Sequence, residues 1–569
     1  MSRIARTLII SAMCSPVVLA AAAGLYLWPH YHQRIIVSRG TTFITRPLHE
    51  DGTPNYLAAF NDIAGHGVKP DDNAAIPLLF VLRPTEPVLM PYWRSEVKAL
   101  GITKPRGTAP AMGSLTAFFR GRMHGPAPRL MPMDANGMPT GMAYNPGASA
   151  ALLHNRASRA AEDLRNMRGP GMPTGLPQLF DKYGEADRAL EQERALTTRQ
   201  AWQGKDAPVF DAFLRGNGPA IRATRRASEK TGFFVPLIGQ TQNSAHMAFA
   251  YMPWLAQANS LSDTLLAKAN LDLGKNNVAG CEANLIAIHR LGRLLAQEPV
   301  LIVYLVGLSI DHTADKGDRI LLTAPGLNEQ DAAGYLRRLS RLSAMPKITA
   351  AINIGERMTQ LDICVSFYRD IFGNPENNPD SADINGRFLD KFINWNPTLV
   401  RINKGFDLLG QYAAVHVYCQ RAEQLRTAMR TMAARIRLLR IGPFGHTPNH
   451  ILSQLLRSDF HDIVGSCRLA ASEKARTRLT RIGFALAAYH LERGGYPRSL
   501  AELCPKYLQT IPRNPLTGKP PVYARTTSGY TLSSPDPFTH KGTSWQFRRG
   551  LIIQIPAPVK PGHKKISLP

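Results

Sequence analysis

An uninterrupted apolar run lies near the amino end of the chain. Residues 7–28 read TLIISAMCSPVVLAAAAGLYLW, which is 22 positions without a charged side chain. At about 1.5 Å per residue, a helix of this length crosses a hydrocarbon layer about 30 Å thick. The run therefore predicts an uncleaved transmembrane anchor. The other interpretation is a signal peptide, because Ala20 to Ala23 offer the small side chains of a cleavage site.

The charges beside this run bear on its orientation. Arg3 and Arg6 precede the run, and Arg34 and Arg39 follow it, so the two sides nearly balance. Long domains cross a membrane largely regardless of their charge. We expect a single-pass membrane protein that contacts lipid through the apolar run. Residues 1–6 are then a cytoplasmic tail, and the body is extracytoplasmic.

The first part of the body, residues 40–100, is predicted to be a small helical unit. Apolar side chains recur at helical spacing over residues 56–63, and Gly65 supplies a stop. A second helix is predicted over residues 71–82, because two aspartates suit its first turn.

Residues 101–204 are rich in glycine, proline and methionine and are predicted to be irregular, apart from a short polar helix around residues 185–200. Four methionines near His124 have the thioethers that soft metals prefer. Methionines also fill gaps in loops, and we predict no metal or other cofactor here. These methionines are Met131, Met133, Met138 and Met142.

Helical periodicity dominates residues 205–475, which are predicted to form a helical body. Two leucine stripes fit a pair of antiparallel helices joined near Gly274. Pro299 precedes the apolar run 300–310, which is too short to span a bilayer and predicts a buried helix. Asn328 is placed to cap a further helix. The succession resembles tetratricopeptide repeats in style but lacks their signature residues, so we expect an irregular helical array.

A heptad seam runs over residues 421–439, with apolar side chains at alternating steps of three and four. The seam lasts under three heptads, so it is expected to pack inside the body. Arginines flank it and form a basic edge, which is either a contact for a polyanion or a solvated charged face. The candidate polyanion contacts are Arg421, Arg426, Arg430, Arg437 and Arg440.

The chain as a whole is basic, with 68 Lys and Arg against 42 Asp and Glu and a formal net charge of +26. Such a surface attracts nucleic acid, anionic lipid or acidic glycan without choosing among them, and a basic proteome gives the same balance. Nucleic acid is not expected as a partner if the body is extracytoplasmic. A protein or an anionic polymer remains as the expected partner.

Strand candidates follow a helix near the carboxyl end. The helix is predicted from about Arg476 to Arg493, and residues 476–555 are expected to form a small α+β module. A basic tail, residues 556–569, follows the module. The strand candidates are residues 521–524, 529–532, 544–547 and 551–555.

Particular residues of this module form a recognisable pattern. They are Tyr489, Gly494, Gly495, Tyr496, Pro497, Leu500, Leu503, Pro512, Asn514, Pro515, Gly518, Tyr523, Tyr530, Leu532, Ser534 and Asp536. The pattern resembles the globular part of the type II secretion major pseudopilin. The family has an aspartate at Asn514, and only Asp536 matches its calcium loop, so calcium is not implied. Residues 7–14 lack the processed pseudopilin motif, so a pilus subunit is not expected.

The order of segments carries a second resemblance. The anchor, residues 55–75, the helical body and the C-terminal module together resemble a group of uncharacterised bacterial membrane-anchored proteins. This likeness implies an architecture and carries no activity or catalytic residue with it.

Local catalytic signatures are missing from the sequence, which has no P-loop, dinucleotide fingerprint, zincin helix or nucleophile elbow. Ser95 and Lys98 have the spacing of a serine–lysine pair, residues 381–386 imitate the start of a calcium loop, and His30 and His32 form a possible metal pair. The first has a simpler interpretation as a chance tetrapeptide, the second as a polar turn, and the third as side chains at the membrane interface. No catalytic, cofactor or metal residue is predicted.

These observations predict a mainly α protein with an N-terminal transmembrane helix, an irregular helical array and a small C-terminal α+β module. The expected function is a non-enzymatic envelope protein that binds another protein or a surface polymer, or serves as a scaffold. The alternatives are an envelope hydrolase whose site is assembled from distant residues, and a polyanion-binding protein.

Overall fold

The computed structural model describes most of the body of the protein. The described residues are 34–84, 89–102, 111–116, 118, 176–239, 247, 250–372, 395–414, 417–418, 448–535 and 552–555. The predicted anchor and its cytoplasmic tail lie outside these residues. So do the methionine-rich segment, residues 381–386, the heptad seam with its five arginines, the strand candidate 544–547 and the basic tail.

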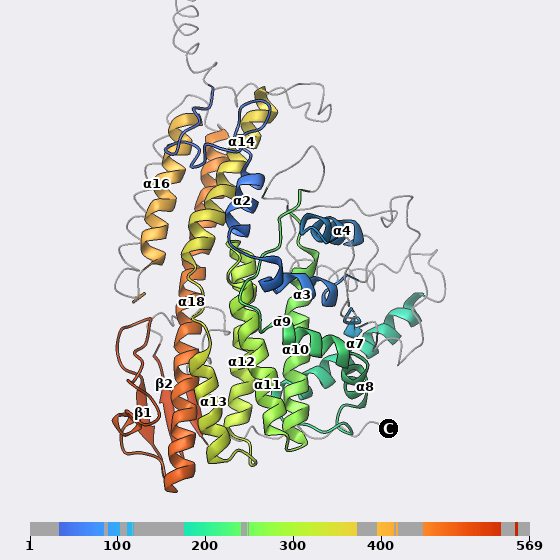
Figure 1. Ribbon diagram of the computed structural model, residues 1–569, viewed down its shortest axis with the longest axis vertical. Coiled ribbons are helices and arrows are strands. Elements are labelled where there is room, and N and C mark those ends of the chain that lie inside the picture. Colours follow the sequence, from blue (N-terminus) through green and yellow to red (C-terminus); the bar gives the residue numbers. More distant parts are fainter. Residues whose placement is uncertain are drawn as a thin grey trace, which may run out of the picture.

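Long helices run side by side along the longest axis of the molecule, and a small sheet lies against one end of them (Figure 1). The long helices are α10 (Pro253–Gly274), α11 (Val278–Leu295), α12 (Leu301–Leu322), α13 (Glu329–Arg341), α14 (Arg357–Phe372), α16 (Trp395–Ala413) and α18 (Pro448–Arg493). The mainly α class predicted from the sequence is confirmed.

A second group of elements, most of them short, lies beside these helices. They are α2 (Tyr56–Gly65), η1 (Pro70–Asp72), α3 (Ala75–Val81), α4 (Met90–Ala99), α7 (Leu176–Arg199), α8 (Pro208–Gly216) and α9 (Gly218–Ala227). The predicted pair of helices in the first unit is present as α2 and α3, and the side chain of Asn55 caps α2 by accepting from the Ala58 amide. Pro77 lies in the first turn of α3, where its missing N–H costs no helical hydrogen bond.

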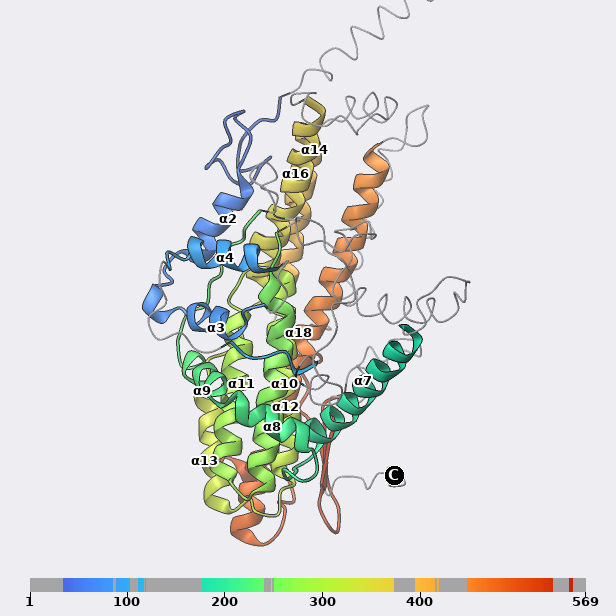
Figure 2. The same cartoon turned by 90° about the vertical axis from the view of Figure 1, so that its right-hand side faces the viewer.

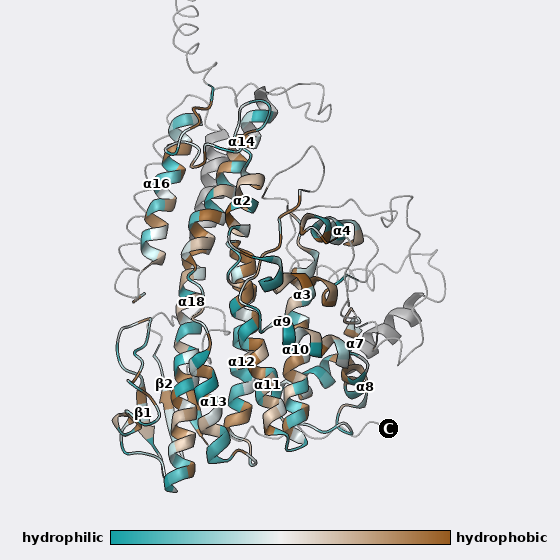
Figure 3. Ribbon diagram, in the orientation of Figure 1, coloured by the Kyte–Doolittle hydropathy of each residue, from teal (hydrophilic) through white to brown (hydrophobic). Residues whose placement is uncertain are grey.

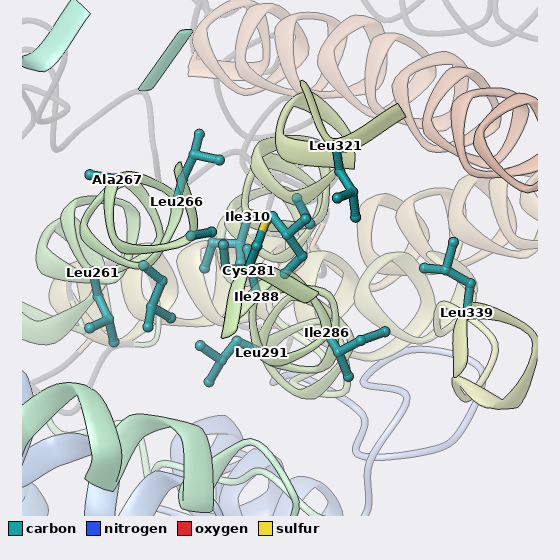
Figure 4. Close-up of a cluster of buried hydrophobic side chains, with 14 of the residues drawn as sticks. Leu261, Leu266, Ala267, Cys281, Ile286, Ile288, Leu291, Ile310, Leu321 and Leu339 are labelled. Atoms are coloured by element: carbon teal, nitrogen blue, oxygen red, sulfur yellow. The ribbon is translucent and has the colours of Figure 1, made fainter. Parts of the chain in front are cut away.

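The predicted antiparallel pair is α10 and α11, which pack on each other and on α12. Their side chains meet in the apolar cluster of Figure 4, which includes Leu266, Ile288 and Ile310. Helix α12 begins two residues after Pro299 and continues past the apolar run to Leu322, because its later apolar positions remain on the buried side. The side chain of Asn328 caps α13 by accepting from the Asp331 amide, as the sequence predicts.

Helix α7 is longer than the sequence indicates. A short polar helix is expected around residues 185–200, whereas α7 begins at Leu176. Contacts far along the chain hold its C-terminal half: Arg194 pairs with Asp263 of α10, and Glu193 accepts from the Phe210 amide of α8. Figure 2 shows α7 inclined to the long helices. Because these partners are remote in sequence, local periodicity does not report them.

Helix α18 also extends beyond its predicted start near Arg476. It begins at Pro448 and ends at Arg493, where Gly494 adopts a φ of 72° and donates to the His490 carbonyl. Glycine accepts this left-handed conformation without steric cost. The helical body and the C-terminal module therefore share one continuous helix.

The C-terminal module adds a three-stranded antiparallel sheet in the order β1–β2–β3. The strands are β1 (Val522–Arg525), β2 (Tyr530–Ser533) and β3 (Ile552–Ile555). Tyr523 pairs with Leu532, and Leu532 pairs with Ile553. Leu532 and Ile553 belong to the same apolar cluster as Phe484 of α18, so the sheet shares the core of the helices.

The long helices carry mixed polar and apolar surfaces (Figure 3). Among the described residues, none of the helices has the length and apolarity needed to cross a bilayer. The same residues contain four cysteines, all with free thiols: Cys281, Cys364, Cys467 and Cys504.

Two glycines let α11 and α12 approach to backbone contact. A Cβ placed on Gly292 would lie 2.6 Å from the carbonyl oxygen of Gly307, and a Cβ on Gly307 would lie 2.6 Å from that of Gly292. This approach brings the polar residues on either side of it, His289 on α11 and Asp311 on α12, within hydrogen-bonding range. Glycine at both positions is therefore required by the packing.

We expect Gly292→Ala to lower the free energy of unfolding by about 1–3 kcal/mol, because an added methyl group overpacks the contact. The matched control is Gly334→Ala in α13, whose Cβ would meet only the Arg337 guanidinium at 3.8 Å. That variant should gain up to about 1 kcal/mol from helix propensity. Urea unfolding of both variants measures the difference, and an unaltered midpoint for Gly292→Ala would contradict the close approach.

Candidate ligand-binding site

Three aspartates line one face of α12. Asp311, Asp315 and Asp318 follow one another at steps of four and three residues, which places them on one side of a helix. Each is at most 1% exposed. Carboxylates at this depth need partners, because removing a charge from water costs several kcal/mol. The neighbouring helices supply these partners.

His289 of α11 lies between two of these carboxylates. Its Nδ1 is 2.6 Å from Asp311 Oδ1, and its Nε2 is 3.0 Å from Asp318 Oδ2. Burial lowers the pKa of His289, but the two carboxylates outweigh burial and raise this pKa to about 10. The ring is therefore an imidazolium at neutral pH, and both of its N–H groups donate.

Arg293, one turn further along α11, completes the pairing of Asp311. Its Nη1 donates to Asp311 Oδ1 and, at 2.8 Å, to the His289 carbonyl, while its Nε donates to the Ser343 carbonyl at 2.8 Å. Burial acts to raise the pKa of Asp311, but Arg293 and His289 prevail and hold the pKa of this carboxyl below its usual value. Asp311 is thus an anion with two cationic partners.

Helices α13 and α18 close the network from the other side. Tyr335 of α13 donates to Asp318 Oδ1 at 2.6 Å, and Thr480 of α18 donates to Asp315 Oδ1 at 3.1 Å. Burial, and then the negative charge of Asp311, raise the pKa of Asp315 to about 7. Asp315 has no cation in direct contact among the described residues, which leaves it the least compensated of the three aspartates.

A second polar group lies beside Asp315, on the α18 side. Glu473 of α18 pairs with Arg476, and its Oε1 lies 3.6 Å from Nδ1 of His312. Burial and the nearby charges of Arg476, Lys316 and Arg319 lower the pKa of His312 to about 3, so its ring is neutral. Within the described part of the chain, His312 Nδ1, Asp315 Oδ2 and Glu473 Oε2 are buried atoms without a hydrogen-bond partner.

A cavity of about 410 Å³ opens next to this network, between α12, α18, the end of α16 and the segment that follows α13. Asp311 and Glu473 reach its wall, where both are already paired. Its apolar wall is formed by Tyr304, Leu342, Met345, Ile348, Leu409, Tyr412 and Val464. The cavity is therefore lined by both polar and apolar side chains, and small-molecule sites likewise combine an apolar wall with polar groups.

Five positively charged side chains line the cavity. Besides Arg293, it is lined by Lys347, Lys474, Arg478 and Arg481. The last two donate to main-chain oxygens, Arg478 to the Arg513 carbonyl and Arg481 to the Leu339 carbonyl. Among the described residues, no carboxylate forms an ion pair with any of these four cations.

The pKa values of this cluster are lowered first by burial and then, for Lys474 and Arg481, by neighbouring cations. Burial, and then Arg478 and Lys347, lower the pKa of Lys474. Burial, Arg293 and Arg478 lower the pKa of Arg481, and burial lowers that of Arg478. Like charges repel at this range, and a bound anion would relieve the repulsion. The arrangement therefore fits an anionic group better than a neutral one.

The structure places one of the residue pairs considered in the sequence outside any site. Ser95 lies on the exposed face of α4, and its hydroxyl donates to the Pro91 carbonyl at 3.0 Å, so it has no nucleophilic role with Lys98. The five arginines of the heptad seam, His30, His32 and residues 381–386 lie outside the described residues. Their roles stay predictions.

The residues that do converge were not singled out in the sequence. A signal for them exists: three aspartates at helical spacing follow the apolar run at the start of a helix, over residues 301–322. Their partners His289 and Tyr335 lie on separate helices, so no local motif joins them. The cations of the cavity are likewise drawn from α11, α18 and the segment after α13.

The fold and the cavity define a mainly α protein with a buried ionic network beside a basic cleft. No known protein family matches the chain, and no curated protein or solved structure shows significant similarity to it. The residues themselves therefore carry the functional argument.

We expect Tyr335→Phe to lower the free energy of unfolding by about 1.5–3 kcal/mol, because it removes a hydrogen bond to the charged Asp318. The matched control is Tyr304→Phe, which removes a 3.1 Å hydrogen bond to the neutral Pro346 carbonyl. That change should cost about 0.5–1.5 kcal/mol. Chemical denaturation at pH 7 compares the two, and equal losses would contradict a stronger hydrogen bond to the Asp318 side chain.

Stability should fall as pH rises above neutrality, through His289. The folded-state pKa of about 10 lies above the unfolded value of about 6.5. The stabilisation is therefore complete below pH 6.5 and is lost as pH rises through 10, with a slope of about 1.4 kcal/mol per pH unit. Urea unfolding of the wild type and of His289→Gln between pH 7 and 10 tests this. The free energy of unfolding should fall less steeply with pH in the variant, because His289 no longer contributes. The same fall with pH in both proteins would contradict the prediction.

Proposed function

We propose that the protein is a membrane-anchored binding protein whose cleft takes an amphipathic ligand with an anionic head, such as a carboxylate or a phosphate on an apolar body. The observation that carries this proposal is a group of exposed to half-buried cations that line the cavity and form no ion pair with a carboxylate among the described residues. A carboxylate or phosphate accepts hydrogen bonds from Arg and Lys and neutralises their charge.

The shape of the cleft supports a ligand with two parts. Lys474, Arg478 and Arg481 lie at steps of four and three residues on α18, so their side chains project from one face of that helix. Tyr304 and Leu409 lie on the walls, from α12 and α16. An anionic head on the cations thus leaves the rest of the ligand against apolar side chains, where burial stabilises it.

The anchor and the side of the membrane remain part of the proposal and rest on the sequence. Residues 7–28 are the proposed transmembrane segment, with the amino terminus in the cytoplasm and the body in the extracytoplasmic space. The likeness of the C-terminal module to a pseudopilin supports export of the body.

Asn514 gives that module a defined turn, because its side chain accepts from the Leu516 amide and donates to the Pro535 carbonyl at 2.9 Å.

Binding is favoured over hydrolysis by the state of His289. Both of its ring nitrogens are taken by Asp311 and Asp318, and its side chain is fully buried. A general base must reach the proton that it removes from a ligand or a nucleophile. His289 has no such access, and it serves the packing of the helices. The polyanion alternative rests on the arginines of the heptad seam, whereas the cleft is sized for a small molecule.

Isothermal titration of the protein with octyl phosphate tests the proposal. The protein is first treated with a chelator, so that bound metal ions do not contribute to the measured binding. We expect saturable one-to-one binding that weakens with added salt, and no binding of octyltrimethylammonium, which has the same apolar chain and the opposite charge. The variant Lys474→Gln/Arg478→Gln should weaken the affinity at least about tenfold, because it removes two charge-assisted contacts.

The matched control is Lys275→Gln/Arg337→Gln, which removes two positive charges at positions outside the cleft. It should bind octyl phosphate as the wild type does. Equal binding by both double variants would reduce the interaction to general attraction by a basic surface. Equal binding of the two detergents by the wild type would refute an anion site.

A further inference from the structure

Beside the cleft, a histidine and two carboxylates from two helices converge around buried atoms that lack partners. These residues are His312 and Asp315 of α12 and Glu473 of α18, and one ligand atom of each lies within 4.8 Å of the other two. Asp315 is 1% exposed and Glu473 is 4% exposed. An unpaired buried polar atom costs free energy, and here three such atoms occur in one cluster.

We propose that His312, Asp315 and Glu473 bind a divalent transition-metal ion of the Zn²⁺ or Mn²⁺ class. The spacing suits one ion, because ligands at about 2.1 Å from a metal lie about 3–4 Å from each other. The Glu473 carboxylate lies next to His312, with Oε1 3.6 Å from His312 Nδ1 and Oε2 without a partner among the described residues. His312 and Asp315 are three residues apart on α12, so both project from the same face of the helix.

The charges around this cluster define what it can hold. Arg476 pairs with Glu473, and Lys316 and Arg319 lie near enough to affect His312. Arg476 contacts Oε1 of Glu473, while Oε2 has no partner among the described residues. Arg476 can therefore orient the carboxylate as the outer partner of a metal ligand does. The two carboxylates supply oxygen ligands, and the neutral imidazole adds the nitrogen that Zn²⁺ and Mn²⁺ accept.

A second cluster shares Asp315 with the first. It contains His289, Asp315 and Asp318, whose ligand atoms also lie within 4.8 Å of one another. In that cluster both ring nitrogens of His289 already have carboxylate partners, and Tyr335 donates to Asp318. The first cluster contains the three unpartnered atoms, so it is the one to which we assign the ion.

This proposal is independent of ligand binding in the cleft. Glu473 lines the cleft, but the cations that receive the anionic head are Lys474, Arg478 and Arg481. The double variant Lys474→Gln/Arg478→Gln should therefore keep the stoichiometry of metal binding. Octyl phosphate is tested on chelator-treated protein, so a negative result in one titration contradicts only the proposal that it tests.

Titration of the chelator-treated body with Zn²⁺ tests the proposal, with Co²⁺ as a spectroscopic probe. We expect one ion per chain at micromolar or lower concentration, and a visible Co²⁺ absorption that Zn²⁺ displaces. His312→Gln and Glu473→Gln should each weaken Zn²⁺ binding at least about tenfold. His312 has a side chain that is 32% exposed, so its variant is expected to fold even if Glu473→Gln does not.

The matched control is Glu96→Gln. Glu96 is a glutamate 1% exposed with an unpartnered Oε2, like Glu473, but it belongs to no cluster of potential ligands among the described residues. Zn²⁺ affinity should be unchanged in this variant. Wild-type protein that binds no Zn²⁺ would overturn the proposal and assign the unpartnered atoms to a buried water. Loss of binding in Asp318→Asn with His312→Gln unaffected would also overturn it, in favour of the second cluster.

Discussion

The contact of His289 with Asp311 and Asp318 is the interaction on which the core of this protein depends. One imidazolium from α11 pairs with two carboxylates that lie two turns apart on α12. Arg293 adds a second positive charge, to Asp311, and Tyr335 donates a hydrogen bond to Asp318. Burial of Asp311 and Asp318 depends on these partners, because loss of one of them would leave an uncompensated charge in a low-dielectric interior.

The ionic network constrains the backbones of the helices that carry it. Short hydrogen bonds between α11 and α12 require the two helices to approach closely, and Gly292 and Gly307 permit that approach. Apolar side chains surround the network on all four helices that contribute to it. The polar contacts thus fix the register of the helices, while apolar burial supplies most of the driving force for their association.

The polar and charged side chains of α18 differ in how far partners compensate their charges. Its Thr480 donates to Asp315 of the network, whereas Lys474, Arg478 and Arg481 line the cleft and form no ion pair with a carboxylate among the described residues. Folding can leave such groups uncompensated where a ligand completes them. The same helix carries Glu473, so the two proposed sites lie side by side along one element of the fold.

Sequence patterns predicted those elements whose causes are local. Leucine periodicity gave the pair α10 and α11, and Asn328 marked the start of α13. Strands β1 and β2 lie within one residue of their predicted bounds. The start of α7 and the start of α18 were wrong, because remote contacts extend α7 and because the mixed surface of α18 hides its apolar stripe. The candidate site was not predicted, since its residues come from four helices.

The sequence by itself determined a helical body, the cap at Asn328 and the apolar run that predicts an anchor, because each depends on residues close together in the chain. The tertiary structure alone decided which polar residues meet. Asp311 and His289 lie 22 positions apart, and Asp315 and Thr480 lie 165 apart. No period in the sequence records such pairs, because they are set by the packing of whole helices. The ionic network, the basic cleft and the proposed metal ligands are products of that packing.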